Sequence, residues 1–305
     1  MALVAGDQAA ALRQMAQRRS GTGPPARRAP VIAIASGKGG VGKTTIAVSM
    51  GISLARRGLK VALIDADLGL ANADLMCGLR PTARLSEAVA RVAQGDRVSV
   101  ELVRRMSMRG PAGMVVVPGM VGPLRHASSM DARAAVSQTV DLLARAMDVV
   151  VVDHGAGLGA SVRDGLSRAA LPLVVATPDP ASLADAYALV KSVRSCASER
   201  IPYLLLNRAK DADDARSAHA RVAEVAAKFL GCGLPLVGFV PEDPMVQRCS
   251  RARRPLALAA PKSSATRHLN KVVDRLAGEI EPGRSDSDRP SRPRRGFLAR
   301  LVRDR

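Results

Sequence analysis

The chain has 305 residues, 47% of them hydrophobic, which is enough to bury the core of one large α/β domain with tails. Its formal net charge of +19 favours an anionic partner, either nucleic acid or acidic lipid. No apolar run approaches the roughly 18 to 20 residues that span a bilayer, and the first residues lack the apolar core and cleavage site of a signal peptide, so we expect a cytoplasmic protein.

Residues 1–19 form the first predicted unit, a helix from residue 6 that Asp7 can cap. Residues 20–30 contain two glycines and three prolines and cannot continue a helix. They predict a flexible linker. We therefore expect the first helix to be tethered to the domain and not built into its core. From the residues alone, a frayed terminus is favoured over a functional segment.

A phosphate-binding pattern follows at residues 31–45, where an apolar run leads into a glycine-rich turn and a helix start. The pattern G-x-x-x-x-G-K-[ST] is met by Gly37, Gly42, Lys43 and Thr44. Glycines let backbone N–H groups point at phosphate oxygens, and the start of the helix adds a positive field. We expect Lys43 on the β- and γ-phosphates and the Thr44 hydroxyl on Mg²⁺. Two buried lysines in this loop would be costly without an anion.

The rest of the domain alternates predicted strands and helices up to about residue 278. An acidic turn at residues 65–74 follows the second strand, at the edge where α/β sheets bind ligands. Four consecutive valines precede Asp153 and predict a central parallel strand buried on both faces. We predict an α/β fold, a doubly wound and mostly parallel sheet with helices on both faces at 31–278. The predicted strands are 60–65, 113–119, 148–153, 171–176, 203–206 and 235–240, and the predicted helices are 43–57, 84–94, 130–147, 181–195, 214–230 and 262–277.

The C-terminal residues have a different composition. Residues 279–293 are rich in proline, serine and charge and predict a disordered tether. Residues 294–305 predict a short basic amphipathic helix, the form of an interfacial membrane anchor. The alternative is a solvated basic tail. The residues on the apolar face of this helix are Phe297, Leu298, Leu301 and Val302.

The glycine-rich loop carries a second lysine directly after its first glycine, and this detail resembles the deviant Walker A motif of the MinD/ParA superfamily of P-loop ATPases. The resemblance implies ATP and Mg²⁺ as cofactors. It also implies that Lys38 reaches across a dimer interface to the partner's nucleotide, so that ATP drives homodimer formation. The matching residues are Lys38, Gly39, Gly40, Val41, Gly42, Lys43, Thr44 and Thr45.

Other segments resemble further parts of that family's site. Residues 65–72 resemble its switch I, which implies that Asp67 positions the attacking water while Asp65 supports the site and the metal. Residues 153–157 resemble switch II, where Asp153 has the Walker B position for Mg²⁺ and Gly157 ends the segment. His154 departs from the family's Thr or Ser. We expect an exposed, tolerated substitution, and the alternative is that His154 titrates or repositions the loop. The residues that resemble adenine-side elements are Asn207, Arg208, Pro241 and Glu242.

Both tails resemble features of one branch of the superfamily. The N-terminal segment resembles the D-Q-A-x-x-L-R motif of the FlhG (FleN) branch, which implies docking on the GTPase FlhF and stimulation of its GTP hydrolysis. The C-terminal helix resembles the membrane-targeting sequence of MinD-type proteins. Together they imply an ATP-driven switch on the inner face of the cell membrane that sets the number or position of flagella. Flagellar switch-complex proteins or a flagellar transcription regulator are further possible partners. The motif residues are Asp7, Gln8, Ala9, Leu12 and Arg13.

Two other functions stay open. One is a ParA-like partition ATPase that uses its positive charge on DNA, and the other is a MinD acting on cell division. The D-Q-A motif argues against both, and the C-terminal helix argues against the DNA-binding function. The nitrogenase-iron-protein branch is disfavoured because no cysteine pair stands where a shared cluster would need one. The four scattered cysteines are Cys77, Cys196, Cys232 and Cys249.

Overall fold

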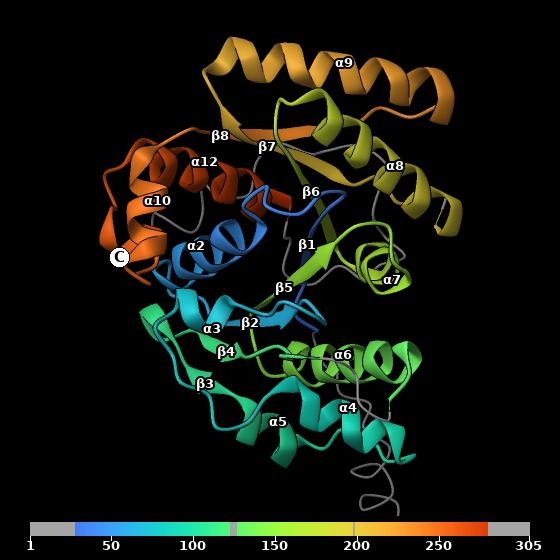
Figure 1. Ribbon diagram of the computed structural model, residues 1–305, viewed down its shortest axis with the longest axis vertical. Helices are drawn as coiled ribbons and strands as arrows, with labels where there is room; N and C mark the ends of the chain where they lie inside the picture. The colour runs from blue at the N-terminus through green and yellow to red at the C-terminus, as the bar shows by residue number, and fades with distance from the viewer. Residues whose placement is uncertain (1–27, 123–126, 198, 280–305) are drawn as a thin grey trace, which may run out of the picture.

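The computed structural model describes residues 28–122, 127–197 and 199–279. In this part of the chain eight strands form one sheet in the order β3-β4-β2-β5-β1-β6-β7-β8 (Figure 1). All neighbouring strands are parallel except β3 and β4, which are antiparallel. The strands are β1 Val31–Ser36, β2 Val61–Ala66, β3 Met108–Arg109, β4 Val115–Val117, β5 Val149–Ala156, β6 Leu171–Ala176, β7 Tyr203–Ala209 and β8 Leu236–Pro241.

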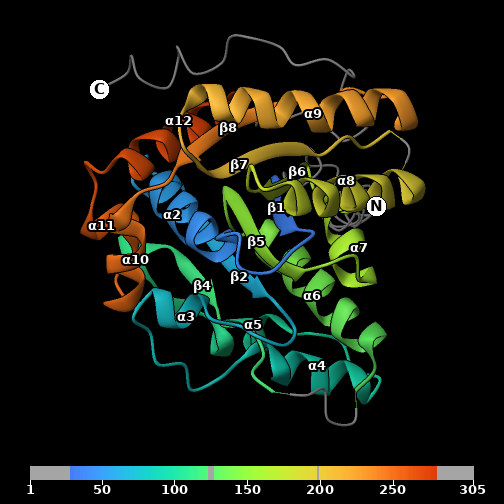
Figure 2. The ribbon, with the colours of Figure 1, turned by 45° about the horizontal axis from the view of Figure 1, so that its top comes forward.

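Helices cover both faces of this sheet, as Figures 1 and 2 show for α2 and α12 on one side and α6, α7 and α8 on the other. The predicted doubly wound α/β fold is therefore confirmed. The helices are α2 Lys43–Ala55, α3 Ala73–Met76, α4 Leu85–Ala93, α5 Val100–Met106, α6 Ser129–Ala144, α7 Ala160–Arg168, α8 Pro180–Cys196, α9 Ala212–Leu230, α10 Pro244–Arg251, α11 Leu256–Ala259 and α12 Ser264–Glu279, with a 3-10 turn, η1, at Pro111–Gly113.

The central strands are apolar up to their carboxyl ends because each of their faces is covered. In β1, Ile32 and Ile34 pack into the cluster under α2 and α12, whereas Ala33 and Ala35 pack into the cluster under α7, α8 and α9. The valines of β5 alternate between two clusters in the same way. Successive side chains of a strand point to opposite faces, so a strand covered on both faces needs an unbroken apolar run.

The order of the strands fixes where a ligand can bind. β2, β4 and β5 lie on one side of β1, and β6, β7 and β8 lie on the other. The connections that leave β1 and its neighbours therefore run toward opposite edges of the sheet. Open α/β sheets bind ligands at the carboxyl ends of the strands near such a reversal. The glycine-rich loop follows β1 at this edge.

Several short elements were not predicted. No element was assigned to the segments that form α5, α7, α10 and α11, and the strand expected at 113–119 is limited to Val115–Val117. α7 buries only Val162 and Leu166, and α10 buries only Cys249, so neither carries a long apolar repeat that a helix prediction could detect. The start of the expected strand is taken by η1, where Ala112 has a φ of 54°.

The boundaries of the domain also differ slightly from the prediction. Ala29, placed in the linker, is buried, and its N–H donates to the carbonyl oxygen of Ala144 at 2.6 Å. The predicted helix at 1–19, most of the tether at 279–293 and the predicted helix at 294–305 lie outside the described residues. Across the described ranges, no helix combines the length and apolar character needed to cross a membrane.

Candidate nucleotide site

The glycine-rich loop enters α2 through backbone conformations that only glycine adopts easily. Gly40 has a φ of 76° and Gly42 a φ of 95°. A Cβ atom on Gly42 would overlap the Asn207 amide, and one on Gly37 would overlap the backbone of Asp185 in α8. No side chain caps α2, and its first turn holds no acidic residue. Its first N–H groups are therefore available to an anion such as a phosphate.

The two lysines of the loop differ in their surroundings. Lys43 is buried beside Asp153. Lys38 is half-exposed, and its Nζ lies 3.6 Å from Oδ2 of Asp179, the N-cap residue of α8. The expectation of two buried lysines is therefore wrong for Lys38, because the loop turns its side chain outward at the carboxyl edge of the sheet.

Two buried carboxylates lie side by side at this edge, since Asp65 in β2 and Asp153 in β5 are partners in the strand register. The Asp65 oxygens accept N–H groups from Asp67, Asn72 and Ala73 at 2.9 to 3.1 Å. Burial raises the pKa of Asp65 to about 6 in spite of these bonds. Asp65 therefore holds the switch I turn in place through its backbone.

Asp153 has the surroundings of a metal ligand. Burial raises its pKa to about 8, helped by the Asp65 charge and opposed by a hydrogen bond from Thr44 and by the charge of Lys43. Its Oδ1 atom is buried without a hydrogen-bond partner. A cation held between this carboxylate and the Thr44 hydroxyl would satisfy that oxygen, so these residues fit Mg²⁺. Within the described ranges no group of three or more His, Cys, Asp or Glu side chains is placed to hold a metal.

Asp67 belongs to switch I and faces the backbone of switch II. Its Oδ1 accepts N–H groups from Gly69 and Leu70 at 3.2 and 3.1 Å. A Cβ atom on Gly155 would lie 3.4 Å from the same oxygen, so the switch II backbone passes directly beside this carboxylate. Two residues further on, the N–H of Gly157 donates to the carbonyl oxygen of Ser36 at 2.9 Å.

His154 is buried, with 4% of its surface exposed, so the prediction of an exposed substitution is wrong. β5 continues past Asp153 to Ala156, and His154 pairs in register with Ala66 of β2. Its ring lies against α7 at Gly165, where a Cβ atom would overlap the ring. Burial lowers the pKa of His154 to about 4, so the ring is neutral near pH 7. Sequence reasoning missed this contact because its signal is one glycine in a helix that was not predicted.

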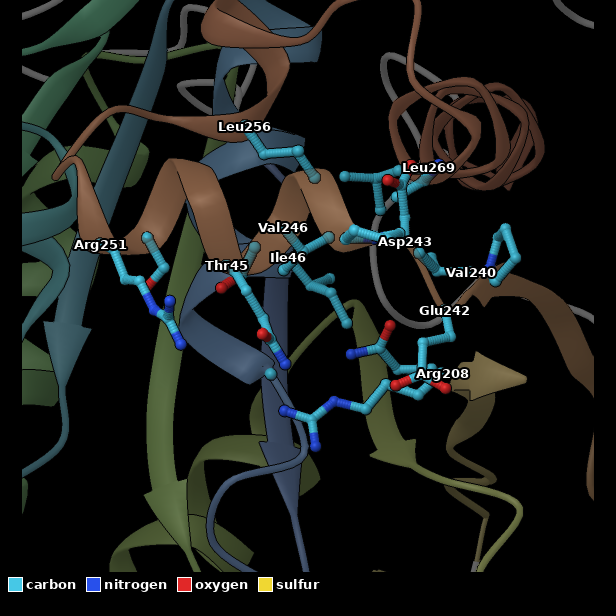
Figure 3. A pocket seen from close by; sticks show the side chains of 17 residues that line it. Thr45, Ile46, Arg208, Val240, Glu242, Asp243, Val246, Arg251, Leu256 and Leu269 are labelled. Atoms are coloured by element: carbon cyan, nitrogen blue, oxygen red, sulfur yellow. Dashed lines mark hydrogen bonds between the residues drawn. The ribbon is translucent and has the colours of Figure 1, made fainter. Parts of the chain in front are cut away.

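A cavity of about 480 Å³ opens beside the glycine-rich loop (Figure 3). Arg208 of β7 and Arg251 of α10 both reach it. Asn207 ties this side to the loop, because its Nδ2 donates to the carbonyl oxygen of Val41 at 2.7 Å. The predicted residues that line the cavity are Gly42, Thr45, Asn207, Arg208, Pro241 and Glu242, with Asp243 of the same predicted loop, and lining residues that the sequence analysis missed include Val246, Gln247, Arg251 and Leu269.

The missed residues come from α10, which was not predicted, and from α12, whose apolar face reads as ordinary core. Asp243 joins these two helices. Its side chain accepts the N–H of Met245 at 2.9 Å and the N–H of Ala265 at 3.0 Å. The lining combines apolar side chains, such as Ile46, Val246 and Leu269, with polar and charged ones, a mixture that suits a planar base with polar edges. The predicted partner residues at 7–13 and membrane residues at 297–302 lie outside the described ranges.

Comparison with known proteins agrees with this geometry. Residues 32–256 match the model of the CobQ/CobB/MinD/ParA nucleotide binding domain. The chain is 33% identical over 254 residues to "Antiactivator FleN" of Pseudomonas aeruginosa, covering 81% of this chain and 85% of FleN. It is 29% identical over 277 residues to "Flagellum site-determining protein YlxH" of Helicobacter pylori, covering 89% of each. A solved MinC:MinD cell division complex from Aquifex aeolicus has a TM-score of 0.64 at 29% identity, covering 84% of this chain and 99% of that one.

Proposed function

This chain belongs to the CobQ/CobB/MinD/ParA nucleotide-binding family, and we propose from that premise that it is an ATP-driven switch that regulates the number or placement of flagella. It is a MinD/ParA-type ATPase whose relatives include FleN and YlxH. The observation that carries the flagellar part is the likeness to these two proteins over more than four fifths of the chain. The D-Q-A segment supports the same branch.

In the proposed cycle, the loop N–H groups and Lys43 bind the phosphates of ATP. Thr44 and Asp153 would hold Mg²⁺, and the bound ion would supply positive charge against the phosphates. Asp67 orients the attacking water at close range to the triphosphate. The buried, unpartnered oxygen of Asp153 and the uncapped start of α2 support these assignments.

We assign dimer formation to Lys38. Both members of its ion pair with Asp179 are half-exposed, and exposed ion pairs of this kind contribute only about 0–1 kcal/mol. Lys38 can therefore leave Asp179 at little cost when the phosphates of a nucleotide in a second copy become available. A site completed by the partner's lysine makes dimerisation depend on ATP.

The tails give the switch its targets. Residues 7–13 dock on an FlhF-type GTPase and stimulate GTP hydrolysis. Residues 297–302 bind the inner face of the cell membrane, with the surrounding arginines on anionic lipid. One such helix, which must also fold on binding, is a weak anchor. Two helices presented by one ATP-bound dimer bind with an avidity raised by about 10² or more.

A GTPase assay tests the partner assignment. Purified FlhF-type GTPase from the same organism is incubated with GTP and with this protein in its ATP state. We expect faster GTP hydrolysis with the full chain and basal hydrolysis with Gln8→Ala/Arg13→Ala. A version lacking residues 1–20 should also fail to stimulate GTP hydrolysis but should keep its melting temperature and ATP binding. That result would show that the loss of stimulation does not come from unfolding of the domain. Full stimulation by that truncated version would contradict the assignment.

A MinD-like role in cell division is the second candidate. It is favoured by the 29% identity and TM-score of 0.64 to MinD in the MinC:MinD complex, since this identity equals that to YlxH. The two candidates differ in the phenotype of a deletion strain. Loss of a division switch gives misplaced septa with normal flagella, whereas loss of a flagellar switch gives altered flagellar number or position with normal septa.

A further inference from the structure

The switch II backbone is fastened at both of its ends. At one end, Asp153 accepts a hydrogen bond from Thr44. At the other, the N–H of Gly157 donates to Ser36 of β1 at 2.9 Å. Gly155 lies between these points, and a Cβ atom built on it would lie 3.4 Å from Oδ1 of Asp67, an ordinary contact distance. The switch II backbone at Gly155 therefore borders the space in which the Asp67 carboxylate lies.

His154 supplies a third attachment, next to Gly155. Its buried ring occupies a notch in α7 that exists because residue 165 is glycine. The helix that carries the notch is itself held, since Nη1 of Arg133 in α6 lies 2.7 Å from Oδ2 of Asp164. Val162 and Leu166 anchor the same helix in the core. A ring seated in this notch cannot shift without moving α7.

We propose that His154 is a positioning residue for ATP hydrolysis, whose ring, seated against Gly165, fixes Gly155 beside Asp67 and so sets the carboxylate that orients the attacking water. This inference rests on the role of Asp67 in the proposed function. The inference also requires His154 and Gly165 to act as one unit. A small residue at 154 leaves the notch unfilled, and a side chain at 165 expels the ring, so either change releases the same contact.

The test compares His154→Ser, Gly165→Ala and the double variant in the full-length protein. We measure kcat and KM for ATP hydrolysis, the affinity for a fluorescent ATP analogue, and the melting temperature. Each single variant should lower kcat about tenfold, because a misplaced orienting group is costly in rate. KM and the affinity should stay within about twofold, since neither residue contacts the phosphates or the base cavity. The double variant should lose about tenfold and not about a hundredfold, because both changes remove one contact.

Two controls separate this result from simple loss of stability. Gly278→Ala is another helical glycine substitution, at a position with no atom near the added Cβ, and should leave kcat unchanged. If Gly165→Ala alone fails to fold, His154→Ser and the double variant, in which the smaller serine leaves room, carry the comparison. A wild-type kcat in His154→Ser would overturn the inference. Losses that multiply in the double variant, or ATP affinity that falls in parallel with kcat, would overturn it as well.

The Asp67→Asn variant, measured in the same assays, distinguishes failure of the role given to His154 from failure of the role given to Asp67. If Asp67→Asn abolishes hydrolysis while His154→Ser does not change it, only the role of His154 is wrong. If Asp67→Asn hydrolyses ATP at the normal rate, the proposed role of Asp67 fails and this inference fails with it.

Discussion

The ammonium nitrogen of Lys38 lies 3.6 Å from Oδ2 of Asp179, so the lysine assigned to a partner's nucleotide is paired within its own chain. Both side chains are 50% exposed, and the pair joins the glycine-rich loop to the start of α8. Asp179 also caps that helix, since its Oδ2 accepts the N–H of Ser182 at 3.1 Å. In the proposed ATP-bound dimer, Lys38 must therefore leave Asp179 before it can reach the nucleotide of the partner.

Asp179→Asn should favour the ATP-bound dimer. Asparagine caps a helix as well as aspartate does, so α8 should be unaffected, while Lys38 loses its intramolecular partner. We expect the dimer dissociation constant in ATP to fall by about two- to fivefold, in line with an exposed ion pair of about 0–1 kcal/mol. Light scattering after size exclusion measures this. An unchanged or weaker dimer would show that the pair does not compete with dimerisation.

Lys43→Ala should abolish nucleotide binding. The substitution removes the buried positive charge next to the phosphate cradle, and loss of such a charge partner costs about 3–5 kcal/mol, or more than about a hundredfold in affinity. The measurement is the rise in melting temperature that ATP and Mg²⁺ cause. Lys60→Ala, an exposed lysine at the opposite edge of the sheet, is the matched control and should keep the full rise. Tight ATP binding by Lys43→Ala would contradict the site assignment.

Asp67→Asn should separate hydrolysis from dimerisation. The amide keeps an oxygen that can accept the N–H groups of Gly69 and Leu70, so the switch I turn is preserved, but it cannot orient water as a carboxylate does. We expect the hydrolysis rate to fall by about a hundredfold or more while ATP still drives the dimer. Phosphate release and light scattering report the two properties. A variant that stays monomeric with ATP and Mg²⁺ would count against the dimer with a nucleotide in each half.

Phe297→Asp should abolish membrane binding. Burial of a few apolar side chains contributes roughly 25 cal/mol per Å², and each nearby arginine adds about 1 kcal/mol. One helix therefore binds the membrane weakly, and stable binding needs the two helices of the dimer. In liposome sedimentation we expect pelleting that needs both ATP and anionic lipid and that weakens with salt. Phe229→Asp is the matched control, because this phenylalanine on α9 is already 65% exposed in the domain. Equal pelleting with ADP, or on zwitterionic vesicles, would contradict the avidity mechanism.

Sequence patterns predicted the parts of this fold that depend on long, unbroken signals. The strands at Val149–Val152 and Leu171–Ala176 are apolar throughout because both faces of the sheet are covered. The glycine-rich loop was predicted down to single residues, since its geometry requires glycine at named positions. Helices such as α7 and α10 escaped prediction because each buries too few residues to form a detectable repeat.

The contacts that the sequence could not reveal are between single residues that lie far apart in the chain. His154 reads as an exposed exception until Gly165 is seen to make room for its ring. Asp65 holds the switch I turn through three backbone N–H groups, from residues up to eight positions further along the chain, and no spacing rule predicts these contacts. The base cavity depends in the same way on Val246 and Leu269, from two helices that meet only in the folded domain.

The central claim is that ATP binding by this protein controls flagella, and the most direct test is to count flagella in a deletion strain of the source organism. We predict an altered number or position of flagella, restored by the wild-type gene but not by Lys43→Ala or by the version lacking residues 1–20. Septum placement and cell length should stay normal. Unchanged flagella in the deletion strain, or full rescue by Lys43→Ala, would contradict the account.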